Sequence, residues 1–423
     1  MRRNYERLAW TVLLLSFAAC LVLAIGTPLG IQWFVRYSYA GQRLMLDVQE
    51  GTPFVTCSDT NVPFPATSQQ DNLCLGRENI QITTGPTDQG LLHIRSRTAV
   101  TATLSSVQIY RDTQVWLQQA TTPRFPSLSA ESDHVTLQIK SGRIRVVVPS
   151  NLARALLFQV VTPQALVQLS EGSASVEVRN QETQVTVGEG KAFVVATANK
   201  SVVELAAAQR VVVQSGGGVT EAMPAERNLL AGHSDFREPL GNIWKSYTLD
   251  TQIPGESRGD ATNVNVDGRQ AVDLSRIGQG FAETGIKQEI NRDIRGFQSL
   301  QLRMTLRVLQ QDVPLCGTAG TECPVMVRLD YVDDSGEARF WQQGFYYLPD
   351  PNNFNPEFCN TCNPRNIHIR TVNGVWYSYE SDNLIPILTK VGSPPVFLKS
   401  ISVYASGHIY QSQVAEVQLL GQE

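Results

Sequence analysis

An uncharged apolar segment near the N-terminus most constrains how this chain can fold. Residues 8–35 carry no charged side chain, and about 20 apolar residues are enough to cross the hydrocarbon core of a bilayer. Three arginines precede the segment, whereas only Arg36 and Arg43 follow it closely. Because basic residues collect on the cytoplasmic side, we predict a single-pass cell-membrane protein. Its cytoplasmic stub is residues 1–7, and everything after the transmembrane helix lies outside the cytoplasm.

Two alternatives to this anchor share its sequence pattern. Basic residues followed by an apolar run also begin cleaved export signals. In addition, residues 17–20 (Phe-Ala-Ala-Cys) resemble a lipoprotein processing box, which would lipidate Cys20. The apolar run continues to Ile25, whereas a mature lipoprotein normally turns polar after its cysteine. We therefore favour a membrane helix that contains Cys20.

Composition and alternation predict an all-β chain beyond the anchor. The formal net charge is -4 and the pI is about 5.8, so no basic field favours nucleic acid as a partner. Short runs alternate apolar and polar residues, with glycines between or beside them, as in 135–140, 175–178 and 184–187. This alternation is typical of half-buried strands, and glycine suits the turns of hairpins. We expect an antiparallel β domain over residues 40–214.

Several of these runs carry a family resemblance. They are 82–85 (Ile-Thr-Thr-Gly), 141–148 (Ser-Gly-Arg-Ile-Arg-Val-Val-Val), 158–165, 169–178 and 185–190. In this order the runs resemble the FecR family of bacterial envelope proteins. Members of that family that regulate transcription hold an anti-sigma segment on the cytoplasmic side. Residues 1–7 are too few to fold into a partner-binding domain, so we expect no direct control of a sigma factor.

The C-terminal half reads as a second β domain after a linker. Residues 215–227 begin with Ser-Gly-Gly-Gly, and glycines give a linker its backbone freedom. Strands reappear over 228–423, and a two-sheet jelly-roll sandwich accommodates them economically. This segment resembles galactose-binding-like, carbohydrate-binding-module jelly rolls. The features that carry the resemblance are the opening at 228–230, Phe236, Trp244, the hairpin at 331–336 and the terminal strand.

Six cysteines lie beyond the anchor: Cys57, Cys74, Cys316, Cys323, Cys359 and Cys362. An even number outside the cytoplasm predicts disulfides. Proximity pairs Cys57 with Cys74, while the last four are either bridged locally or cross-linked to one another. Cys-x-x-Cys spacing at 359–362 also suits a zinc site or a redox pair. The oxidising location favours structural disulfides, so we predict no metal and no cofactor.

Motifs for catalysis are missing from the sequence. The five histidines, His368 among them, lack metal-ligand spacing, and no nucleophile elbow or phosphate-binding loop occurs. Asp330, Asp333, Asp334 and Glu337 fall at an expected hairpin, where acidic residues commonly form turns. We therefore predict a protein that is not an enzyme and has no catalytic residues.

Aromatic residues of the C-terminal domain offer a candidate ligand-binding surface. We select Trp341, Tyr346, Trp376 and Tyr377, because exposed rings stack on sugars and often mark recognition sites. The competing interpretation places these rings in the sandwich core. The resulting hypothesis is an envelope protein that recognises glycan or another cell-envelope ligand. The alternative is a scaffold or signalling protein that binds a partner membrane protein.

Overall fold

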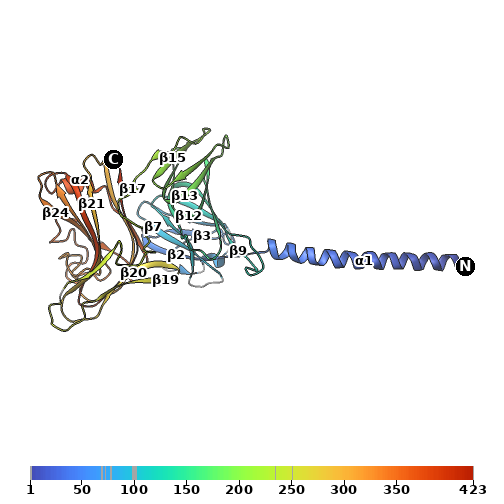
Figure 1. The fold of residues 1–423 in the computed structure, drawn as a ribbon, viewed down its shortest axis with the longest axis horizontal. Coiled ribbons are helices and arrows are strands. Elements are labelled where there is room, and N and C mark those ends of the chain that lie inside the picture. The colour runs from blue at the N-terminus through green and yellow to red at the C-terminus, as the bar shows by residue number, and fades with distance from the viewer. Residues whose placement is uncertain are drawn as a thin grey trace.

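The computed structural model describes residues 2–67, 70–71, 73–76, 79–97, 102–233, 235–249 and 251–422. One long helix projects from one end of a body made almost entirely of strands (Figure 1). Along the long axis the order is helix, first β domain, second β domain. The prediction of an all-β chain with an N-terminal apolar helix is confirmed.

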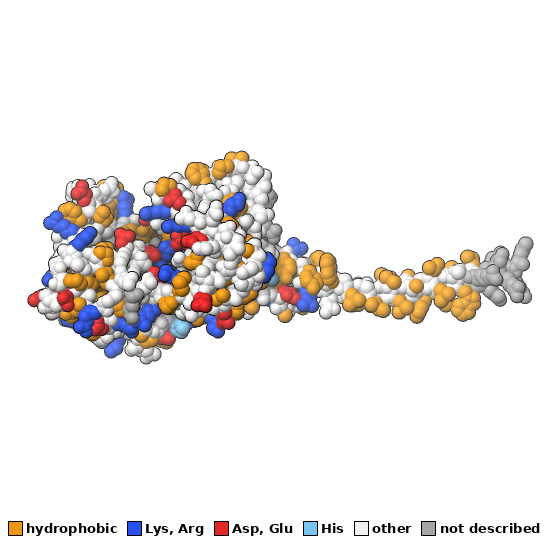
Figure 2. Space-filling view, turned by 90° about the horizontal axis from the view of Figure 1, so that it is seen from above, with side chains coloured by type: hydrophobic (Ala, Val, Ile, Leu, Met, Phe, Trp, Pro, Cys, Tyr) orange, Lys and Arg blue, Asp and Glu red, His pale blue; other side chains and the backbone are white. Residues whose placement is uncertain are grey.

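Helix α1 (Arg2–Tyr37) carries exposed apolar side chains over most of its length. Figure 2 shows them along the rod, in contrast to the mixed surface of the β body. The most apolar 18-residue window of Leu8–Tyr37 has a mean hydropathy of 2.5, and none of that window is buried by the rest of the described chain. Cys20 lies on it as a free, exposed cysteine. A helix of this length and composition either spans a membrane or is a signal sequence.

The first β domain is a single continuous hydrogen-bonded sheet in the described part of the chain. Its strands are β1 (Tyr39–Gly41), β2 (Arg43–Glu50), β3 (Phe54–Thr56), β4 (Pro63–Pro65), β5 (Gln70–Asp71), β6 (Ile80–Thr83), β7 (Gln89–Arg95), β8 (Thr103–Ile109), β9 (Gln114–Pro123), β10 (Asp133–Val148), β11 (Leu156–Val161), β12 (Ala165–Arg179), β13 (Glu182–Ala196), β14 (Val202–Ala206), β15 (Gln209–Gln214) and β16 (Met223–Pro224). The 3-10 helix η1 (Leu73–Gly76) lies between β5 and β6.

Strand β10 organises this sheet because it changes partners midway. Its first part pairs with β9 and β11, and its second part pairs with β8 and β12. The change falls beside Gly142, whose φ of +92° favours glycine and where a Cβ would collide with Thr113. The β10–β11 pairing is parallel, so the expected antiparallel domain contains a parallel pair. The sheet therefore coils over itself and encloses a core.

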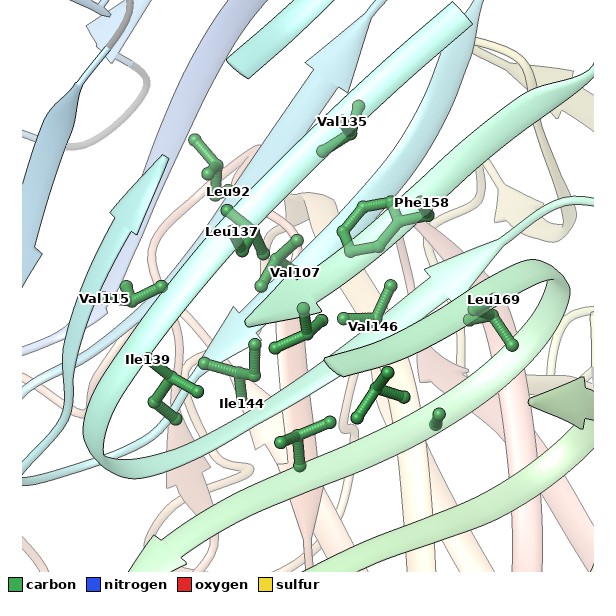
Figure 3. Close-up of a cluster of buried hydrophobic side chains, with 14 of the residues drawn as sticks. Leu92, Val107, Val115, Val135, Leu137, Ile139, Ile144, Val146, Phe158 and Leu169 are labelled. Atoms are coloured by element: carbon green, nitrogen blue, oxygen red, sulfur yellow. The ribbon is translucent and has the colours of Figure 1, made fainter. Parts of the chain in front are cut away.

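Alternate residues of these strands build that core. Leu137 and Ile139 from one part of β10, and Ile144 and Val146 from the other, converge with Phe158 of β11 (Figure 3). All five side chains are essentially inaccessible to solvent. Successive side chains of a strand point to opposite faces of the sheet, so every second residue of the alternating runs is buried in this core.

The glycine-rich stretch expected as a linker is held against the first sheet. Gly216 has a φ of +74° in the turn after β15. Strand β16 then pairs with β15, and the Ala225 amide donates to the carbonyl of Ala208 at 2.8 Å. Backbone pairing thus fixes the connection between the two β domains at several points.

The second β domain is a sandwich of two sheets. One sheet holds β17 (Arg227–Asn228), β19 (Asp260–Val266), β20 (Arg269–Arg276), β22 (Ser299–Gln311), β26 (Tyr377–Glu380) and β28 (Tyr410–Gln422). The other holds β18 (Lys245–Thr248), β21 (Ala282–Asp293), β23 (Val325–Asp333), β24 (Ala338–Tyr346), β25 (Ile369–Arg370) and β27 (Pro395–Gly407). Helix α2 (Leu384–Thr389) follows β26, with Asn383 as its N-cap. Strands from β20 onward cross repeatedly between the sheets, which is the jelly-roll pattern predicted.

Candidate binding groove

The four aromatic residues expected to bind ligand are buried. Trp341 and Tyr346 are each 3% exposed, Trp376 is 2% exposed and Tyr377 is 7% exposed. Trp341 and Tyr377 belong to the core between the two sheets of the sandwich, and Tyr346 packs against Cys316 and Cys323. A ring that stacks on a sugar must present an open face. The expectation that these residues offer exposed rings to a ligand is therefore corrected.

Trp376 instead helps to join the two β domains. It packs with Ala271 and Ala415 of the sandwich and with Leu91 of the first domain. The guanidinium groups of Arg269 and Arg307 both lie over its ring, with Cζ atoms 5.0 and 4.7 Å from the ring centroid. Trp376 is therefore part of an interface within the chain and not part of an exposed surface.

A polar groove runs along the junction of the two domains, with a volume of about 990 Å³. Acidic and basic side chains gather along the junction of the two lobes in Figure 2. The first domain contributes Glu50, Gln89, Tyr110, Arg111, Asp112, Ser141, Gly142, Arg143, Val178, Arg179 and Asn180. The sandwich contributes Gln301, Ile369, Tyr377, Ser378, Tyr379, Glu380, Ser381 and Asp382. Of the four aromatic residues selected from the sequence, only Tyr377 lines this groove.

Two tyrosines cross the junction in opposite directions. The Tyr110 hydroxyl of the first domain donates to Glu380 Oε2 of the sandwich at 3.0 Å. The Tyr377 hydroxyl of the sandwich donates to Glu50 Oε1 of the first domain at 3.1 Å. Each carboxylate is therefore held by the other domain, so the groove keeps its shape only while the domains stay docked.

Arginines complete the environment of Glu380. Arg143 and Arg303 donate to its Oε1 at 3.2 and 3.1 Å, and the Arg143 guanidinium also stacks on the Tyr110 ring. Burial by itself would raise the pKa of Glu380, but the two guanidiniums and the tyrosine hydroxyl outweigh it and lower the pKa to about 2. Glu380 is thus an anion at any physiological pH.

A buried ion pair clamps the same junction at greater depth. Arg145 Nη1 donates to Glu416 Oε2 at 3.0 Å, and Arg145 Nη2 donates to the other carboxylate oxygen. The Thr305 hydroxyl adds a third hydrogen bond at 3.2 Å. Burial opposes ionisation of Glu416, yet the attraction of Arg145 prevails and its pKa is lowered. The bidentate geometry fixes the orientation of one domain on the other.

The free edges of the groove are suited to a polar ligand. Arg179 of the first domain, which pairs with Glu177, and Asp382 of the sandwich are exposed, and Tyr379 in the lining is half-buried. Hydroxyl groups both donate and accept hydrogen bonds, so charged side chains of this kind can pair with a hydroxyl-rich ligand. Grooves at domain junctions are a common place for ligand sites.

The cysteines form three local disulfides: Cys57–Cys74, Cys316–Cys323 and Cys359–Cys362. The pair chosen by proximity is present, and the open choice for the other four resolves to local bridges. The last two disulfides meet at His368, which lies within 3.6 Å of Cys316 Sγ and 3.0 Å of Cys362 Sγ. This contact has no sign in the sequence, because the five histidines are scattered along the chain.

Sequence reasoning also missed the residues that build the groove. Glu50, Arg143 and Glu380 are separated by tens to hundreds of positions, and each falls in or beside an ordinary strand pattern. Charged residues on strands normally indicate a solvent-facing side. No local signal distinguishes these three from other strand charges.

Comparison with known proteins supports the resemblance in the middle of the chain. The family model described as FecR protein matches residues 95–193, from the end of β7 into β13. The predicted FecR resemblance is confirmed for this region. No curated protein matches the chain.

Solved structures similar to this chain include proteins of two kinds. A protein assigned as an anti-sigma factor from Parabacteroides distasonis has 19% identity over 34% of this chain, with a TM-score of 0.26. This chain spans 59% of that protein's length. The family 11 carbohydrate-binding module of a Clostridium thermocellum cellulase has 11% identity, covering 47% of this chain and 95% of the module, with a TM-score of 0.25. The xylan-binding domain of a Paenibacillus barcinonensis protein has 10% identity, covering 47% of this chain and 97% of that domain, with a TM-score of 0.26.

Proposed function

We propose that this protein is a membrane-anchored, non-catalytic recognition protein of the cell envelope, which binds glycan in the groove between its two β domains. The observation that carries the proposal is that both domains supply polar side chains to one open groove of about 990 Å³. Helix α1 supplies the anchor, with its N-terminus in the cytoplasm. Three disulfides suit a β body that lies outside the cytoplasm.

The chemistry of the lining favours a sugar chain over an apolar ligand. Glu50 and Glu380 present carboxylate oxygens in the groove wall, and Arg111 donates to Glu50 Oε2 at 2.7 Å. Arg179 and Asp382 remain exposed to contact a ligand. Hydroxyl groups both donate and accept, so a glycan can pair with both kinds of side chain at once. An apolar ligand would leave these groups desolvated without partners, at a cost in free energy.

Binding of the full chain in detergent to an array of neutral and acidic polysaccharides tests the proposal. For a glycan that binds, Arg179→Ala and Asp382→Ala should each weaken the affinity by about tenfold, the effect of losing one well-made polar contact. Lys399→Ala and Glu221→Ala are matched charge controls, because both residues are exposed and lie outside the groove lining. Failure of every glycan to bind, or equal loss in the controls, overturns the proposal.

A second function is favoured by the FecR match over residues 95–193. Under that reading, the β body takes part in envelope signalling by binding a partner membrane protein. Cross-linking in intact membranes followed by purification of the full chain separates the two functions. A single stoichiometric membrane protein captured by the wild type and lost in the groove variants favours signalling. Glycan binding without such a partner favours recognition.

A further inference from the structure

A short loop of the first domain lies beside helix α1. It consists of residues 124–131, between β9 and β10. Strand β1, which follows α1 directly, pairs with the last residues of β9. The Arg124 amide also donates to the Ser38 carbonyl at 2.8 Å, immediately after the helix ends. Backbone pairing therefore fixes the start of the loop next to the end of α1.

Side chains at both ends of the loop contact the last turn of the helix. The rings of Phe125 and Phe34 pack with their centroids 5.9 Å apart. Arg36 Nε donates to Glu131 Oε1 at 2.7 Å. The loop is thus attached to the helix by an apolar contact at one end and by an ion pair at the other.

An apolar cleft with a volume of about 940 Å³ lies between this loop and α1. On the helix side its lining includes Leu23, Thr27 and Ile31, which are four residues apart and so share one face of the helix. On the loop side Leu128 lines it, although the Leu128 side chain is 72% exposed. Figure 2 shows apolar side chains where the rod meets the β body. The cleft is therefore continuous with the apolar surface of the rod.

The length of the uncharged helix segment places this cleft at the level of the membrane. Residues 8–35 rise about 42 Å along the helix axis, whereas the hydrocarbon core of a bilayer is about 30 Å thick. With the segment centred, about four residues at each end lie among the headgroups. Arg36 then lies at the membrane surface, and the helix residues 23–31 lie in hydrocarbon. Leu128, which lines the same cleft, points into the same leaflet.

The loop satisfies its own backbone carbonyls without water. Arg154 Nη1 donates to the carbonyls of Ser129 and Glu131 at 2.8 and 2.6 Å. Arg154 Nη2 donates to the Pro126 carbonyl. Irregular backbone is tolerated at membrane depth only where its polar groups have partners in the protein. One guanidinium provides three such partners, which suits the loop to the edge of a bilayer.

We propose that the loop at 124–131 is a second membrane contact, which inserts Leu128 into the leaflet next to the β body. Phospholipid acyl chains of that leaflet fill the cleft between the loop and α1, because the cleft continues the lipid-facing surface of the helix. This inference rests on the proposed role of α1 as a membrane anchor and does not depend on glycan binding. With the helix and the loop both in contact with the bilayer, the β body is held at one tilt on the membrane.

Fluorescence of a label at Leu128 tests this contact in the full chain. In a Cys20→Ser background, which removes the one free cysteine of the described chain, Leu128→Cys is labelled with the environment-sensitive fluorophore nitrobenzoxadiazole. The protein is then placed in nanodiscs of phosphatidylcholine and phosphatidylglycerol. Phosphatidylcholine with a nitroxide on its acyl chain should remove most of the emission, whereas iodide in the water should remove little.

Two further label positions serve as controls. Ile277→Cys carries the label at an apolar residue of the sandwich that is 76% exposed, and there iodide should quench strongly and the nitroxide lipid weakly. Leu15→Cys carries it within α1 and reports whether the helix is in the bilayer. Circular dichroism of each labelled variant should match that of the unlabelled chain, because all three side chains are exposed.

The pattern over the three positions separates the loop contact from the anchor. Lipid quenching at Leu15 and Leu128, but not at Ile277, supports the proposal. Lipid quenching at Leu15 alone, with iodide reaching Leu128 as readily as Ile277, overturns the loop contact and leaves the anchor intact. Lipid quenching at neither Leu15 nor Leu128 overturns both. A Leu128 label shielded from lipid and from iodide means that protein fills the cleft, which also overturns the proposal.

Discussion

The hydroxyl of Tyr110 donates to the carboxylate of Glu380 at 3.0 Å across 270 positions of the chain. Tyr377 returns the same kind of contact to Glu50. These reciprocal hydrogen bonds place a tyrosine and a carboxylate from each domain in one groove wall. The orientation of the two β domains therefore determines the shape of the groove, and a change in one should alter the other.

The Tyr110→Phe variant should lower the free energy of unfolding by about 2 kcal/mol, because a hydrogen bond to a charged acceptor is worth more than a neutral one. Urea denaturation of the full chain in detergent measures the change. Tyr331→Phe is the matched control, since the buried Tyr331 hydroxyl has no hydrogen-bond partner among the described residues. Removing that hydroxyl should leave the free energy of unfolding unchanged. Equal losses in the two variants would contradict the role of Tyr110.

The Glu416→Gln variant should be destabilised more strongly, by about 3–5 kcal/mol, because it leaves the Arg145 guanidinium buried without its counter-charge. Adding Arg145→Met to the same chain should recover much of the loss. Glu204→Gln provides the control, because Glu204 pairs with Lys191 on the surface and exposed pairs contribute little. Calorimetry of the three variants measures these changes in stability. A double variant no more stable than the single one would contradict an ion pair that bridges the domains.

Acid should weaken the docking of the domains through Glu380. Its pKa in the folded protein is lowered to about 2, from an ordinary value of 4.5. The carboxylate therefore contributes its full stability above about pH 4.5, and this contribution, on the order of 3 kcal/mol, is lost as the pH falls toward 2. The free energy of unfolding of Glu380→Gln should depend less steeply on pH over that window. Parallel curves for wild type and variant would rule out this linkage.

The sequence allowed the type of most elements to be predicted, because alternation along strands such as β10, β12 and β13 follows directly from half-buried sheet. It did not predict that β10 would change partners at Gly142 or pair in parallel with β11. That pairing depends on where the chain after Val148 returns in space, and no local pattern encodes such a return. The Cys57–Cys74 bridge was predictable because the two cysteines lie close together in the chain, whereas the pairing of the last four cysteines stayed open until the structure showed two local bridges.

The site was harder to predict than the fold for a physical reason. Trp376 and Tyr377 are large aromatic residues, and aromatic composition alone does not separate a ligand surface from a buried contact. In the structure, Trp376 lies at the domain junction and contacts the guanidinium groups of Arg269 and Arg307. Glu50 and Glu380 become neighbours only when the two domains dock. A groove that forms only when two domains dock cannot be recognised from a local pattern in either half of the sequence.

The anchor can be tested through the apolar face of α1. Leu15→Arg combined with Val22→Arg should release the protein from membranes after an alkaline wash, because each arginine costs about 2.5–3.5 kcal/mol at the centre of a membrane helix. Leu15→Ile with Val22→Ile is the control that keeps the helix apolar. N-terminal sequencing of the wild type from membranes should begin at the start of α1. A mature N-terminus beyond Tyr37 would identify the helix as a signal sequence.

Hydrogen–deuterium exchange of the full chain in detergent, with and without a bound glycan, tests the central claim most directly. The account predicts slower exchange on binding in two separate stretches, 110–112 with 141–143 in the first domain and 377–382 in the sandwich. The peptides around Lys399 and Glu221 should exchange at unchanged rates. Protection confined to one domain, or located outside the groove, would contradict a ligand site built by both domains.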